Sequence, residues 1–83
     1  MKILFSAADK MSANSAVLFV EFTLPDSPNV YVGVATMDLE GKLREDGLCV
    51  IHKDETTSID NVPMPDDVVA AIQEVAIQQA NKL

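Results

Sequence analysis

Two runs of strand-forming residues in the first half of the chain predict a β-hairpin. Ala16–Leu24 and Val30–Met37 are rich in β-branched and aromatic side chains, with apolar residues recurring at alternate positions. Between them, Pro25–Asn29 contains the proline, aspartate, serine and asparagine that are typical of turns. We therefore expect the two runs to pair as antiparallel strands.

The length of this loop predicts the register of the hairpin. If residues 25–29 form the loop, Leu24 pairs with Val30, and Val20 then pairs with Val34. One face of the hairpin is almost wholly apolar in this register and is expected to face the core: Leu18, Val20, Phe22, Leu24, Val30, Val32 and Val34. The other face carries the pairs Val17/Met37, Phe19/Ala35, Glu21/Gly33 and Thr23/Tyr31. A shift by one residue would mix the two sets, so the pattern favours this register.

The N-terminal segment predicts a short strand followed by a loop. Ile3–Ser6 is apolar enough for a strand, and Ser6–Asp9 matches the helix-start pattern [ST]-x-x-[DE]. We therefore expect this connection to be a loop, with at most a short helix of a turn or two near Lys10–Asn14.

A turn and two further strand segments are predicted after the hairpin. Asp38–Gly41 has aspartate first and glycine fourth, as type I turns prefer, so a third strand is expected to begin near Lys42. A break at Glu45–Gly47 precedes a further strand at Leu48–His52. Whether Leu43 faces the core depends on the conformation at Gly41, which the sequence leaves open.

The C-terminal segment predicts one amphipathic helix that starts at Pro65 and reaches residue 82. Proline suits a first helical position, and Asp66 and Asp67 follow where the helix dipole favours negative charge. The apolar stripe comprises Val68, Val69, Ile72, Val75, Ala76 and Leu83, with Ile77 off the stripe. The predicted fold is α+β: one domain, residues 1–83, in which an antiparallel β-meander of about four strands packs on this helix.

The charge balance limits the partners of such a domain. Thirteen acidic and six basic residues give a net charge of −7, which disfavours direct binding to nucleic acid or to anionic membranes. It favours a protein partner with a basic surface. The chain has one cysteine and lacks both a signal-peptide core and a long apolar run, so we expect a cytoplasmic protein.

No residue pattern supports catalysis or a cofactor. Cys49 and His52 are the one thiol and the one imidazole, but odd spacing on a strand places them on opposite faces. They also leave a zinc ion short of two ligands. The three glycines are too far apart for a phosphate-binding loop. We therefore expect a protein that is not an enzyme and that holds no metal or cofactor.

Two surfaces are candidates for partner binding. The first is an acidic surface formed by Asp38, Glu40, Glu45, Asp46, Asp54 and Glu55. The alternative is that these acids form a solvated rim of turns. The second is the sheet face that one helix leaves uncovered, with Val17, Phe19, Tyr31 and Met37, which suggests a homodimer or another partner. The alternative is that the N-terminal loop covers this face with Met11.

These features suggest a small non-enzymatic protein-binding module that occupies a partner's surface. A more specific hypothesis is an acidic inhibitor that masks a basic nucleic-acid-binding protein, of the kind that phages use against host defence. The alternative is a self-assembling structural or accessory subunit without an inhibitory role.

Overall fold

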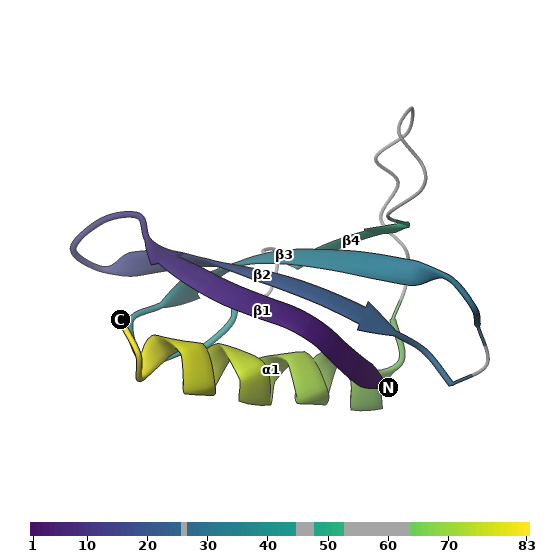
Figure 1. Cartoon of the computed structure of the whole chain (residues 1–83). Helices are drawn as coiled ribbons and strands as arrows, with labels where there is room; N and C mark the ends of the chain where they lie inside the picture. The colour runs from purple at the N-terminus through teal and green to yellow at the C-terminus, as the bar shows by residue number, and fades with distance from the viewer. Residues whose placement is uncertain (26, 45–47, 53–63) are drawn as a thin grey trace.

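The computed structural model describes residues 1–25, 27–44, 48–52 and 64–83, and it confirms the α+β fold (Figure 1). Four antiparallel strands form one sheet in the order β1-β2-β3-β4, and α1 packs against one face of it. The elements are β1 (Lys2–Lys10), β2 (Ser15–Thr23), β3 (Val30–Asp38), β4 (Cys49–His52) and α1 (Asp66–Ala80). We call the face that α1 covers the inner face and the opposite one the outer face.

The N-terminal strand is longer than the sequence predicts. β1 extends through Lys10, and the expected short helix near Lys10–Asn14 is wrong. Ala7 and Ala8 pair with Phe19 and Leu18 of β2, so the ladder supplies the backbone hydrogen bonds that a helix would have offered. Pairing with β2 therefore overrides the helix-start pattern at Ser6–Asp9.

The predicted register of the β2–β3 hairpin is wrong by one residue. Val20 pairs with Gly33 and Phe19 pairs with Val34, so Val20 and Val34 lie on opposite faces of the sheet. The connection is correspondingly longer, because Thr23 pairs with Val30 and the backbone of Ser27 donates to Leu24 within the turn. Since side chains alternate along a strand, this slip moves every β3 residue to the face opposite to the one expected.

Packing of side chains on the inner face is consistent with the observed register. The inner face of β3 consists of Tyr31, Gly33, Ala35 and Met37, all buried. The Phe22 and Tyr31 rings stack with centroids 5.6 Å apart. A Cβ added at Gly33 would lie 3.6 Å from the Phe22 ring, so this ring occupies the space beside the glycine. Gly33 leaves room for the Phe22 ring, which the larger side chain of a valine in this place would crowd.

The turn after β3 forms as predicted, whereas the third strand does not begin at Lys42. Gly41 donates to the Asp38 carbonyl, which closes the turn, and Leu43 forms an isolated bridge with Met37. Regular pairing with β3 resumes at Cys49, opposite Val34. Leu43 packs against the core, whereas the sequence alone did not indicate whether it faces the core or the solvent.

The buried stripe of α1 is narrower than predicted. Pro65 precedes the first helical residue, and the helix ends at Ala80. The buried side chains follow one another every four residues: Val68, Ile72, Ala76 and Ala80. Val69 and Leu83 were expected in the stripe but are exposed, while Ile77 lies off it, as expected. The narrow stripe fits a helix that covers one side of a small sheet.

Polar contacts hold α1 on both sides. The Gln73 side chain donates to the Gly41 carbonyl and accepts a 3.1 Å hydrogen bond from the Leu43 backbone N–H. On the other side, Gln79 Nε2 donates a 2.8 Å hydrogen bond to Ser6 Oγ of β1. The helix is thus fixed between the edge strand β1 and the turn that follows β3.

Candidate protein-interaction surface

The outer face of the sheet carries a contiguous group of apolar side chains. Phe19 of β2 is flanked by Val34 of β3, and β4 continues this row with Cys49. The next row toward the end of β2 sets Val32 beside Ile51. We call the following residues the outer patch: Val17, Phe19, Val32, Val34 and Ile51. All five are partly or largely exposed, and Phe19 is exposed by 38%.

Local sequence explains why these residues lie on strands. Val17, Val32, Val34 and Ile51 are β-branched, and such side chains favour strands because their χ1 freedom is already limited. Each one stands on a strand that is hydrogen-bonded to its neighbours, and α1 lies on the other face (Figure 1). Within the described ranges, no helix or strand packs over the outer patch. The patch is therefore an ordered apolar surface.

Two of the four residues expected on this surface belong to the core. Tyr31 is exposed by 7% and Met37 by 0%, because the one-residue slip turns both toward α1. Val17 and Phe19 lie on the outer face as predicted. Val32, Val34 and Ile51 were missed, because the predicted register turned the two valines toward the core.

The N-terminal connection does not cover the patch with Met11. The Met11 and Ser12 backbone N–H groups both donate to the Ser15 carbonyl, so residues 11–14 form a tight link between β1 and β2. Met11 itself is exposed by 60%. The alternative in which Met11 fills this face is therefore wrong.

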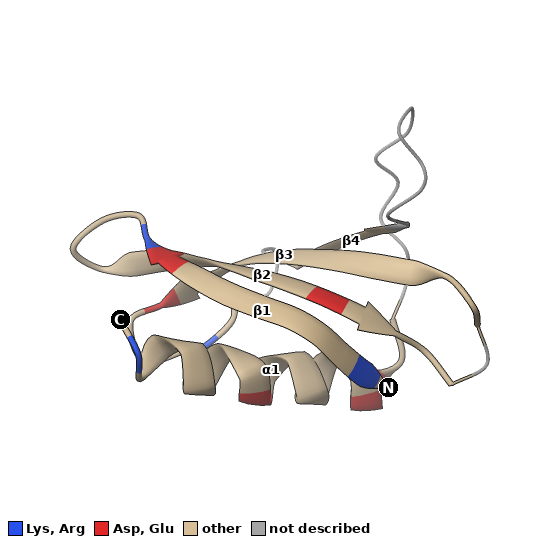
Figure 2. Ribbon diagram, in the orientation of Figure 1, with Lys and Arg blue, Asp and Glu red and all other residues tan. Residues whose placement is uncertain are grey.

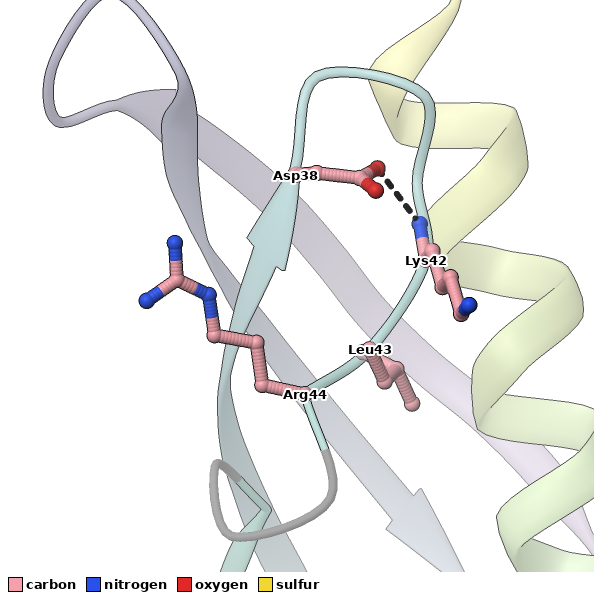
Figure 3. A pocket seen from close by; sticks show the side chains of 4 residues that line it. All are labelled: Asp38, Lys42, Leu43 and Arg44. Carbon is pink, nitrogen blue, oxygen red and sulfur yellow. Dashed lines mark hydrogen bonds between the residues drawn. The ribbon is translucent and has the colours of Figure 1, made fainter.

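The predicted acidic surface lies largely outside the described residues. Glu45, Asp46, Asp54 and Glu55 fall there, and Glu40 is exposed. Asp38 Oδ1 accepts hydrogen bonds from the backbone N–H groups of Glu40 and Lys42, at 2.9 Å and 3.0 Å (Figure 3). The bond from Lys42, with that from Glu40, holds the pKa of the Asp38 carboxyl below its ordinary value of 3.8. Asp38 therefore has a local structural role in the turn.

Two basic residues lie beside this turn. Lys42, Leu43 and Arg44 line a shallow hollow beside Asp38, and Leu43 points toward α1 while Arg44 points away from it (Figure 3). Figure 2 shows the described charges spread over strand ends, the middle of β2 and the helix. Lys42 and Arg44 thus both line the hollow, but their side chains point in different directions (Figure 3).

The register also fixes the relation between the one cysteine and the one histidine. Cys49 pairs with the outer-face residue Val34, whereas His52 pairs with the inner-face residue Tyr31. Positions 49 and 52 thus fall on opposite faces, as the odd spacing predicted. Over the part of the chain that the structure describes, no three His, Cys, Asp or Glu residues gather closely enough to bind a metal ion.

The described helix is too short and too polar to cross a membrane. Comparison of the chain with protein-family models, curated protein sequences and solved structures finds no match. The function is therefore inferred from the sheet, the helix and the outer patch.

Proposed function

We propose that this chain is a non-enzymatic protein-binding module that occupies a partner's surface with the outer face of its sheet. The observation that carries the proposal is the outer patch, five apolar side chains on three neighbouring strands of the face opposite α1. Contiguous exposed apolar surface on a small protein commonly marks an interaction site.

The outer patch has the properties of a binding surface with a low entropic cost. Phe19 is central, with Val17 two residues before it on β2 and Val34 opposite it on β3. Aromatic side chains near the centre of an interface commonly contribute much of the binding free energy. Since strand pairing already fixes the backbone, little conformational entropy remains to be lost on docking.

The charge of the chain extends the proposal to the kind of partner. A net charge of −7 increases the association rate with a protein whose docking surface is bordered by lysine and arginine. A nucleic-acid-binding protein has such a surface, and a chain docked there would mask it. Weaker capture of the partner at about 300 mM than at about 50 mM NaCl is the expected consequence.

A capture experiment with matched variants tests the role of the outer patch. The immobilised chain is compared with Phe19→Glu and Ile77→Glu in extracts of the cells that produce it. Both positions are exposed apolar residues, at 38% and 45%, but Ile77 lies on α1. We expect the proteins retained by the wild type to be retained by Ile77→Glu and lost with Phe19→Glu.

The same retained proteins with all three chains would refute the proposal. Circular dichroism melting of each variant provides the folding control, because a loss of binding is informative only in a folded chain. The self-assembling alternative is distinguished by whether the captured protein is a second copy of the chain.

A further inference from the structure

β1 is one of the two edge strands of the described sheet, and it has a long backbone edge that can pair with another strand. β1 is nine residues long and forms one edge of the sheet among the described strands, so its outer side offers backbone N–H and C=O groups to another strand. Leu4 and Phe5 on this edge are exposed by 46% and 55%. Most edge strands are shorter, or carry charges along their length that prevent pairing.

The faces of β1 follow from its pairs with β2. Ser6 and Ala8 pair with buried residues of β2 and lie on the inner face, as the Ser6–Gln79 hydrogen bond also shows. Phe5 and Ala7 lie on the outer face. The register shifts between Ile3 and Phe5, so Leu4 is the extra residue of a β-bulge. Beyond this bulge, Ile3 returns to the inner face and Lys2 to the outer face.

Only some registers of an antiparallel β1–β1 pair keep side chains of the same face together. A twofold axis perpendicular to the sheet at Ser6 pairs Ser6 with its copy, and Phe5 with Ala7 of the second copy. Because Leu4 is the extra residue of the bulge, it is left out of the pairing, and Ile3 then pairs with Ala8 of the second copy on the inner face. The next pair on the outer face is Lys2 with Asp9, two residues of opposite charge. By symmetry this ion pair forms twice.

The position of α1 is compatible with the same arrangement. The helix lies against β1 and β2, with Gln79 toward β1 and Ile77 toward Gly41 on the opposite side. The side of α1 nearer the β1 edge therefore carries Ala71, Val75 and Gln78. Two helices that each lie about one strand spacing from the axis would pack about 10 Å apart, which is the usual distance.

We propose that a second copy of this chain pairs with the β1 edge, giving a continuous eight-stranded antiparallel sheet with both helices on its inner face. The two outer patches then lie side by side on the other face. The dimer uses the edge of the sheet and not the outer patch, so it can fail while the proposed function stands.

A charge-exchange cycle tests the register. Lys2 and Asp9 are both exposed, so substitutions there leave the core intact. We expect Lys2→Glu and Asp9→Lys each to weaken dimerisation about tenfold in sedimentation equilibrium, because each places like charges opposite each other twice. The double variant should return to within about threefold of the wild type. Lys42→Glu, with the same charge change at the distant turn, serves as the control and should leave the dimer unchanged.

The distance between spin labels on the one cysteine of each chain tests the arrangement directly. Seven strand spacings separate the two copies of β4 in the eight-stranded sheet, so spin labels on Cys49 should lie about 34 Å apart. A dimer formed by the outer patches would instead stack two sheets and place the labels within about 20 Å. Phe19→Glu should dissociate that second dimer and spare the first.

Three results would overturn the proposal. These are a monomeric chain at about 200 µM, a label separation under about 20 Å, or a double charge variant no better than the single ones. The first, accompanied by Phe19-dependent capture of a different protein, would leave the proposed function in place. Equal capture by the Phe19→Glu variant would refute the proposed function and leave the edge dimer standing.

Discussion

The glycine in the turn after β3 provides the most direct test of how this turn meets the helix. Gly41 has φ of 90°, a conformation that an L-residue adopts only with strain. A Cβ at this position would lie 2.5 Å from the Cα of Ile77 and 2.8 Å from its backbone nitrogen. Both atoms belong to the helix backbone, which cannot move aside as a flexible side chain would. The substitution Gly41→Ala must therefore displace either the turn or α1.

The magnitude follows from two contributions. The positive φ costs an alanine about 1–2 kcal/mol, and overpacking against a rigid element adds about 1–3 kcal/mol. Displacement also threatens the two hydrogen bonds of Gln73, which span the same contact. We expect Gly41→Ala to lower the free energy of unfolding by about 2–5 kcal/mol. For a domain of this size, that corresponds to a melting temperature lower by about 10–30 °C.

Gly33→Ala is the matched control, since it makes the same chemical change within the same fold. A Cβ at Gly33 would meet Phe22 at 3.6 Å and Leu48 at 3.8 Å, which are ordinary contacts, and the backbone there needs no positive φ. We expect this variant to be as stable as the wild type or up to about 1 kcal/mol more stable, because alanine restricts the unfolded chain. Urea unfolding followed by circular dichroism measures both. Equal stability of the two variants would refute the reasoning.

Three further outcomes follow from the contacts of the helix and the turn. Ile72 is fully buried, so Ile72→Ala should cost about 2–5 kcal/mol in urea unfolding, whereas Ile77→Ala should cost less than about 0.5 kcal/mol. Gln73→Ala should cost about 1–3 kcal/mol, since it leaves the Leu43 N–H and the Gly41 carbonyl without their partner, and an unchanged urea midpoint would contradict this. Because the pKa of Asp38 is lowered in the folded chain, its stabilising effect is present above the ordinary value of 3.8 and is lost as the pH falls through the lowered pKa. The stability difference between the wild type and Asp38→Asn should thus narrow below about pH 4 in urea titrations, and a constant difference down to pH 2 would count against it.

Alternation and turn chemistry were sufficient to predict most elements of the fold. The β-branched runs of β2 and β3, the aspartate and glycine of the turn at 38–41, and the acidic first turn of α1 are local signals, and the structure has the corresponding elements. Val17 and Phe19 were also placed correctly on the outer face. These features depend on residues that are close in the sequence, where steric and hydrogen-bonding preferences act directly.

The register of β3 depended on how side chains fit together on the inner face. Both alternating sets of β3 are largely apolar. Hydrophobicity alone therefore did not decide which set is buried. One set contains Val30, Val32 and Val34, and the other contains Tyr31 and Met37. The β-branched set resembles a core, but the set with Gly33 leaves room for the Phe22 ring, which stacks on Tyr31. Shape complementarity between side chains of neighbouring strands thus favours burial of this face.

The length of β1 was also determined by tertiary packing. Residues 6–9 carry a helix-start pattern, yet pairing with a complete neighbouring strand offers each backbone group a partner at once. The sequence by itself therefore determined the kinds of element and their order, because these follow from local preference. Only the tertiary structure decided the register, the extent of the edge strand and the composition of the outer patch, because each depends on which surfaces fit together.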